Sequence, residues 1–331
     1  MALKYFVLIL VAQWWMFSHP QKKLFRLSGV AQGTTYSISY VNDDSIVSKS
    51  AVDSIFHVID LSLSLYEEQS LISRFNRVGK IEMDEHLETV VRSSMSIWKL
   101  SHGCFDITVK KLVDLWGFGV GGSGRLPSTK SVNEALLHTG TNYLTIDKDE
   151  LQSVKSVAID CNGIAQGYTV DVIFRFLASR DLQDIMVEVG GEVRAVGRKA
   201  DGSMWRIGLE SPSGITEDWY PIEEIVQLDN GAITTSGNYR KYFMNKGKKY
   251  SHVIDPRRGV PVDNGIISVT VVAPDAITAD GWDNGFYVMG IDSSFEMLKK
   301  YPEMDIRIVY QDKEGRIRDT SSAGFKKMMV R

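Results

Sequence analysis

The sequence is poor in cysteine, with only Cys104 and Cys161 among 331 residues. Their wide separation matches neither a zinc-ligand pattern nor a dithiol redox pair, so the sequence excludes both kinds of motif. We expect both cysteines to be small buried side chains. A disulfide between them is the alternative if the protein enters an oxidising compartment.

The sequence also lacks an excess of basic residues, since 38 Lys and Arg stand against 41 Asp and Glu for a net charge of -3. It contains no Lys/Arg-rich tract, and we therefore expect no nucleic-acid partner. Walker A, H-E-x-x-H and G-x-S-x-G motifs are absent. Residues 117–122 formally match G-x-G-x-x-G, but a helical pattern precedes them and no helix follows, which favours an ordinary flexible loop.

A long apolar run occurs only at the N-terminus. Lys4 precedes apolar residues 5–17, and the run ends at Ser18-His19-Pro20. This is the layout of a secretory signal, and the run is shorter than the roughly 20 residues of a membrane-spanning helix. We expect residues 1–20 to be a signal peptide or an N-terminal membrane anchor. In either case we expect the protein to be exported.

The remaining chain has the composition of a globular protein, with 44% hydrophobic and 24% charged residues. Apolar residues at helical spacing predict helices at 51–65, 85–101, 106–116 and 164–178. Alternating or short apolar runs predict strands at 34–41, 143–147, 156–160, 185–189, 193–196, 205–210, 225–228, 250–254 and 266–272, and a hairpin beginning at 306–310. This order indicates an α+β fold, with mixed but mostly antiparallel strands and packed helices.

Three short segments carry oxygen or nitrogen side chains suited to chemistry. Asp280, Asp283 and Asn284 are spaced so that a helical turn would place them on one face, as a hard cation such as Mg²⁺ requires. Two surface turns are an equally good interpretation of the same residues, because Asp-Gly and Asn-Gly both favour turns.

The second segment, residues 160–168, places Asp160 at a predicted strand end and glycines at a strand-to-helix junction. Such a junction exposes backbone N–H groups to an anionic ligand. Helix capping by Asp160 or Asn162 is the alternative, and capping and ligand binding are compatible. The third segment contains His252, a side chain easily tuned as a general base. A lone histidine is more often structural. Arg257 and Arg258, a few residues on, are compatible with phosphate binding or with simple solvation.

These segments resemble the FAD:protein FMN transferases, the ApbE-like flavin transferase family, and the resemblance extends over most of residues 21–331. The matching stretches are Gln32-Gly33-Thr34, Tyr66 with Ser73-Arg74-Phe75-Asn76, Phe105-Asp106-Ile107-Thr108, Leu115-Trp116-Gly117-Phe118-Gly119, Asp160 to Asp171, Val189-Gly190-Gly191-Glu192 and His252-Val253-Ile254-Asp255-Pro256. The resemblance implies one catalytic domain at 21–331 with the ApbE-like fold.

The resemblance also implies a reaction and a set of site residues. Family members cleave the FAD pyrophosphate, attach FMN through a phosphoester to a Ser or Thr hydroxyl of an acceptor protein, and release AMP. The acceptor would be an exported or membrane-bound redox protein, and the location the periplasm or the outer face of the inner membrane. A pyrophosphatase that uses water, and a non-catalytic flavin carrier, remain alternatives.

The resemblance implies a role for each residue that stands at a matching position of the family pattern. FAD would contact Gln32, Tyr66, Cys104, Phe105, Asp106, Asp160, Gln166 and Ile254. Magnesium, with manganese as an alternative, would be held by the Gly163 carbonyl and by Asp280, Asp283 and Asn284. His252 would take the acceptor proton, and Asp255 would either orient His252 or shape its turn. Gln32, Gln166 and Asn284 depart from the family's Met, Lys and Thr or Ser.

Overall fold

The computed structural model describes residues 22–122, 124, 126–210, 222–238 and 241–330. The expected leader at residues 1–20 lies outside these ranges. Within the described ranges, no helix has both the length and the apolar character needed to span a membrane.

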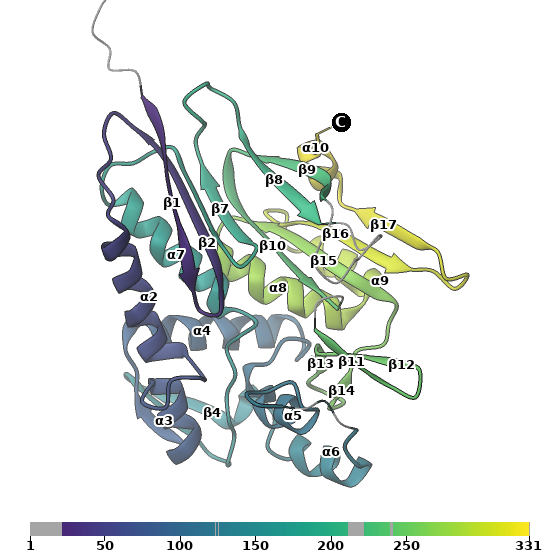
Figure 1. Ribbon diagram of the computed structural model, residues 1–331. Helices are drawn as coiled ribbons and strands as arrows, with labels where there is room; N and C mark the ends of the chain where they lie inside the picture. Colours follow the sequence, from purple (N-terminus) through teal and green to yellow (C-terminus); the bar gives the residue numbers. More distant parts are fainter. Residues whose placement is uncertain (1–21, 123, 125, 211–221, 239–240, 331) are drawn as a thin grey trace, which may run out of the picture.

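An eight-stranded sheet forms the centre of the molecule (Figure 1), with every neighbouring pair of strands antiparallel. Its spatial order is β1 (Lys23–Ala31), β2 (Thr34–Asn42), β6 (Ile185–Val189), β7 (Glu192–Val196), β10 (Asn230–Gly237), β15 (Ile266–Ala273), β16 (Asp305–Gln311) and β17 (Ile317–Ser321). The antiparallel pairing confirms the predicted fold class.

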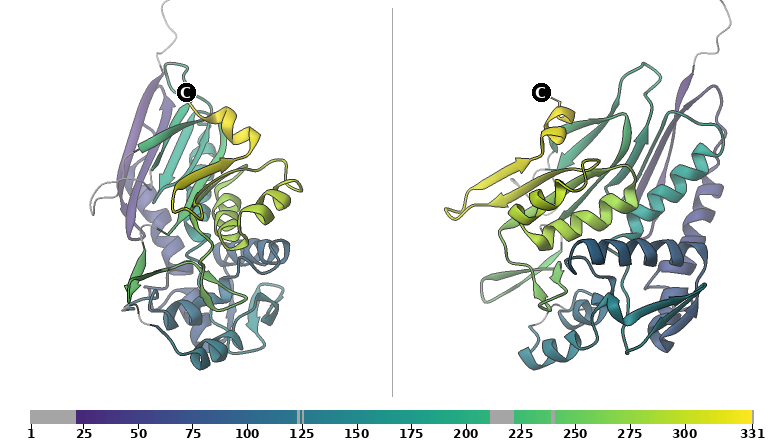
Figure 2. Two further views of the ribbon diagram at one scale, coloured as in Figure 1. Left: turned by 90° about the vertical axis from the view of Figure 1, so that its right-hand side faces the viewer. Right: turned by 180° about the vertical axis from the view of Figure 1, so that it is seen from behind.

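Helices cover one face of this sheet, as the rear view in Figure 2 shows. They are α2 (Lys49–Leu63), α7 (Ala165–Ala178), α8 (Ala276–Met289) and α9 (Ile291–Leu298). The opposite face packs against the hairpin of β8 (Trp205–Glu210) and β9 (Ile222–Leu228) and against α10 (Ala323–Met328) through a cluster that includes Trp205, Val226 and Phe325.

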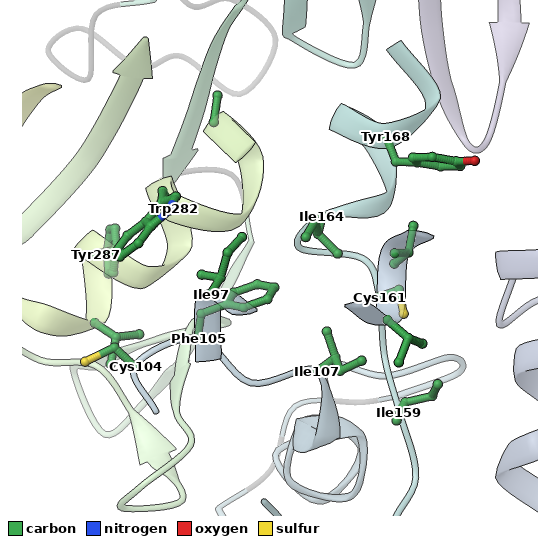
Figure 3. Packing of buried hydrophobic residues seen from close by; sticks show 14 of the residues in the cluster. Ile97, Cys104, Phe105, Ile107, Ile159, Cys161, Ile164, Tyr168, Trp282 and Tyr287 are labelled. Atoms are coloured by element: carbon green, nitrogen blue, oxygen red, sulfur yellow. The ribbon is translucent and has the colours of Figure 1, made fainter. Parts of the chain in front are cut away.

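The chain beside the sheet contains α3 (Leu71–Val78), α4 (Glu85–Leu100), α5 (Lys110–Leu115), α6 (Thr129–Leu136), the 3₁₀ turns at Ile107–Val109 and Thr141–Tyr143, and a small sheet of β3 (Lys80–Glu82), β5 (Glu150–Ser153) and β4 (Leu144–Asp147). Two short hairpins join it, β11 (Tyr242–Asn245) with β12 (Lys248–Ser251) and β13 (Ile254–Asp255) with β14 (Val260–Pro261). Figure 3 shows the buried cluster that unites this region with α7 and α8.

Local sequence explains where several of these elements begin. Asp84 and Asp275 accept backbone hydrogen bonds at the starts of α4 and α8, which satisfies N–H groups that the first helical turn leaves free. Asp171 supplies a long-range cap, because its carboxylate also accepts from the N–H groups of Ala276 and Ile277 at 3.1 and 2.9 Å. Through this contact α7 fixes the start of α8.

Two strand predictions were wrong in detail. Residues 156–160 form no strand, because the side chain of Asn76 bonds both backbone groups of Ile159, at 2.8 and 2.7 Å, where a neighbouring strand would otherwise pair. The strand of this region is β5 instead. The predicted strand at 250–254 is divided, since β12 ends at Ser251 and β13 begins at Ile254.

Both cysteines are buried and unpaired. Figure 3 shows Cys104 and Cys161 separated by the packed cluster. The expectation of two small core side chains is confirmed, and no disulfide joins them.

Candidate functional site

A cavity of about 410 Å³ lies where the α7 and α8 elements meet the end of β10 and the hairpin of β11 and β12. Most of the predicted site residues line it: Cys104, Phe105, Asp106, Asp160, Gly163, Gln166, His252, Ile254, Asp280, Asp283 and Asn284. Its size is typical of small-molecule sites. The fold thus brings residues that lie more than 170 positions apart in the sequence to the same cavity.

The segment from Asp280 to Asn284 is part of helix α8 and is not a pair of surface turns. The side chains of Asp280 and Asp283 are buried, with residue exposures of 4% and 1%. Burial raises the pKa of Asp280 to about 7 and raises that of Asp283 well above its usual range. In the described part of the chain neither carboxylate forms an ion pair, so burial keeps the charged form of both unfavourable unless a cation compensates it.

Asp280 is fixed by helix α7, whose Gly167 N–H donates to its Oδ2 at 2.8 Å. The two helices approach closely at this point. A Cβ added to Gly167 would lie 2.2 Å from the Ala276 carbonyl oxygen and 2.7 Å from the Asp280 Cβ. Glycine is therefore required at 167 to let α7 supply this hydrogen bond.

Asn284 connects the other expected metal ligands. Its Nδ2 donates to the Gly163 carbonyl at 3.3 Å and to Asp283 Oδ1 at 2.9 Å, and its Oδ1 accepts from the Ser236 hydroxyl at 3.1 Å. Oxygens of Gly163 and Asp283 thus converge within reach of one atom. A half-turn of the amide exchanges its oxygen and nitrogen, and the Ser236 hydroxyl can bond either.

This donor set fits a hard divalent cation. It combines two buried carboxylates, a backbone carbonyl and a side-chain amide, all oxygen donors of the type Mg²⁺ prefers. Among the described residues no three His, Cys, Asp or Glu side chains cluster as metal ligands, and the set proposed here contains only two acids. The ligand assignment stays a prediction.

His252 stands at the break between β12 and β13. Its Nδ1 lies 3.0 Å from the Lys241 carbonyl, which can only accept, so Nδ1 carries the proton and Nε2 has the free lone pair. Burial lowers the pKa of His252 to about 4. The imidazole is therefore neutral at physiological pH and able to accept a proton.

Asp255 does not orient His252. Its carboxylate receives the Arg257 guanidinium at 2.9 and 3.0 Å and the Arg257 backbone N–H at 3.0 Å, so it has the structural turn role. Orientation of His252 comes from the Lys241 carbonyl. No local motif could reveal this contact, because Lys241 lies eleven residues away and meets His252 only when the hairpin closes.

Three of the residues predicted to contact FAD differ from the others in where they lie or in what they bond. Gln32 and Tyr66 do not line the cavity: Gln32 bonds Asp60 at 3.1 Å, and Tyr66 is 74% exposed. Asp106 lines the cavity, but its carboxylate accepts four hydrogen bonds from Thr108 and Thr141, which join the 3₁₀ turn at Ile107–Val109 to the one at Thr141–Tyr143.

Known proteins similar to this chain show its family. The sequence model of the ApbE family matches residues 32–308, which is most of the chain. The chain belongs to the ApbE family. Other residues that line the cavity, among them Ser236, Lys241 and Arg307, belong to no motif that the sequence reveals.

Relatives and solved structures of the ApbE family cover nearly the whole chain. An FAD:protein FMN transferase of Vibrio cholerae is 34% identical over 309 residues, 91% of each chain, and one of Haemophilus influenzae is 32% identical over 93% of this chain and 92% of its own. The Pseudomonas stutzeri flavinyl transferase ApbE superposes with a TM-score of 0.83 at 32% identity, over 93% of this chain and 97% of that one. The Thermotoga maritima ApbE protein gives 0.81 at 30%, over 93% and 100%.

Proposed function

We propose that this protein is a Mg²⁺-dependent FAD:protein FMN transferase that modifies a Ser or Thr hydroxyl. The observation that carries the proposal is a single cavity lined by both the neutral His252 and the buried pair Asp280 and Asp283. The printed names of relatives that match over nine-tenths of the chain support the same activity.

In the proposed reaction, the acceptor hydroxyl oxygen attacks the phosphorus of the FMN half of FAD. One O–P bond forms, the pyrophosphate P–O bond breaks, and AMP leaves. His252 Nε2 takes the hydroxyl proton, and the Lys241 carbonyl stabilises the resulting imidazolium through Nδ1–H. Mg²⁺, when bound by Gly163, Asp280, Asp283 and Asn284, would withdraw charge from the pyrophosphate.

The test is incubation of the protein with FAD, MgCl₂ and candidate acceptors, followed by intact mass measurement. Transfer predicts an acceptor mass increased by FMN less one water, located on Ser or Thr, with one AMP released per modification. AMP release that is unaffected by any acceptor would instead identify a pyrophosphatase. Intact FAD after prolonged incubation with Mg²⁺ or Mn²⁺ would identify a flavin carrier.

We also propose an extracytoplasmic location, with an exported or membrane-bound redox protein as acceptor. The support is the sequence of residues 1–20, in which Lys4 is followed by an apolar run typical of a secretory signal. Fractionation of cells that express the full chain tests it, with a variant lacking residues 2–20 as control. Equal cytoplasmic recovery of both proteins would contradict the proposal.

A further inference from the structure

The cavity wall carries many more acidic than basic side chains. The described lining residues include the acids Asp106, Asp160, Glu192, Glu210, Asp280 and Asp283, but only two cations, Lys241 and Arg307. Acidic groups, whether ionised or protonated, offer a negatively charged phosphate no positive charge to bind. A cation on the wall is therefore needed, in addition to any metal ion, to make its binding favourable.

Arg307 is already committed to protein carboxylates. It is 6% exposed, and its guanidinium lies 3.1 Å from Glu224 Oε2 and 3.4 Å from Asp319 Oδ2. Both pairs neutralise its charge, one from β9 and one from β17. Arg307 thus has little charge to offer a ligand.

Lys241 is the lining cation that remains available. It immediately precedes β11 at the base of the hairpin, its side chain is exposed, and in the described part of the structure it forms no ion pair. Burial is the largest influence on two groups of the cavity, and it raises the pKa of Asp160 and lowers that of His252. The positive charge of Lys241 also acts on the cavity, because it lowers the pKa of both Asp160 and His252.

We propose that the Lys241 ammonium binds a phosphate group of the flavin nucleotide at the cavity wall. The inference rests on the proposed function, because it assigns the residue that recognises the anionic part of that substrate. Lysine suits this task as a compact charge with three donors on a flexible stem. Placement beside His252 brings the recognised phosphate to the residue that would take the acceptor proton.

Two different parts of Lys241 serve the site. Its backbone oxygen accepts from both the Nδ1 and the backbone N–H of His252, at 3.0 and 3.3 Å. A side-chain replacement leaves that oxygen in place. Variants of Lys241 therefore separate phosphate binding from the positioning of His252.

The experiment measures equilibrium binding of FAD, FMN and riboflavin, by flavin fluorescence in EDTA so that no turnover occurs. FMN and riboflavin differ by one phosphate, and their Kd ratio isolates its contribution. Lys241→Ala should weaken FAD and FMN about ten- to hundredfold and leave riboflavin within about twofold, as for loss of a charge-assisted hydrogen bond. Lys241→Arg should retain most of the FMN preference.

Lys248→Ala is the matched control, because Lys248 lies on the same hairpin but pairs with the exposed Asp263 outside the cavity. It should bind all three flavins as the wild type does. A Lys241→Ala variant that keeps the wild-type FMN-to-riboflavin ratio would overturn the inference and leave the proposed function standing. Wild-type protein that binds no FAD either in EDTA or with Mg²⁺ would overturn both.

Discussion

The backbone N–H of Gly167 donates to the Asp280 carboxylate at 2.8 Å, and this contact joins the expected metal-binding face of α8 directly to α7. It depends on a residue without a side chain, since a Cβ at 167 would lie 2.2 Å from the Ala276 carbonyl oxygen. The geometry of the site therefore depends on how closely two helices pack.

Gly167→Ala should separate α7 from α8. We expect a destabilisation of about 1–3 kcal/mol from overpacking, together with a higher Mg²⁺ concentration for half-maximal transfer. Gly285→Ala is the control in α8, because its added Cβ has no neighbour nearer than 3.7 Å. Alanine there should stabilise the protein by about 0.5–1 kcal/mol. Equal melting temperatures for the two variants would contradict the packing argument.

Asp283→Asn should abolish stabilisation by magnesium. Burial already disfavours the charged form of Asp283 in the metal-free protein, so the neutral amide should leave the free energy of unfolding without metal equal or higher. Wild-type protein at about a hundred times its Mg²⁺ Kd should gain about 2.7 kcal/mol, measured as a thermal shift. The exposed Asp263→Asn serves as control. A wild-type Mg²⁺ shift in the Asp283 variant would remove Asp283 from the ligand set.

His252→Ala should leave FAD affinity nearly unchanged and lower the transfer rate about 10²- to 10⁴-fold, because it removes the proton acceptor and no flavin-binding charge. Flavin fluorescence measures the affinity, and acceptor mass measured over time gives the rate. Wild-type transfer by this variant would exclude His252 as the base.

The pH dependence of transfer should reflect the lowered pKa of His252. The neutral imidazole is the active base, so activity is lost as pH falls through the folded-state pKa of about 4. The single-turnover rate at pH 6 should remain close to its value at pH 7. An ordinary histidine with pKa 6.5 would be only about a quarter neutral at pH 6, and a half-loss near pH 6.5 would contradict burial of this side chain.

Asn76→Ala tests the segment that was wrongly predicted to be a strand. The substitution leaves both backbone groups of Ile159 without their partner and should cost about 2–4 kcal/mol. Asn42→Ala is the control, because its bond to the Asp44 carbonyl is exposed. Urea unfolding of the two variants measures the difference, and equal costs would show that water replaces the Asn76 amide.

Sequence alone determined the local periods and the chemistry of the site. The alternation around Tyr36 and Ile38 predicted β2, and the spacing of Asp280, Asp283 and Asn284 indicated oxygen donors that would share one face if the segment were helical. The resemblance then connected these donors with Gly163 and His252. Strand alternation and helical spacing depend on residues within one or two turns of one another, so the linear sequence shows them directly.

Tertiary structure decided everything that depends on distant partners. The spacing at Asp280 left surface turns and a buried helix equally possible, and packing of α8 on the sheet selected the helix. Residues 156–160 have a strand pattern, yet the amide of Asn76 takes the place of a neighbouring strand. Closure of the hairpin brings the Lys241 carbonyl to Nδ1 of His252, and this hydrogen bond fixes the tautomer of His252. Burial and long-range hydrogen bonds arise only on folding, and these interactions set the charge state of the site.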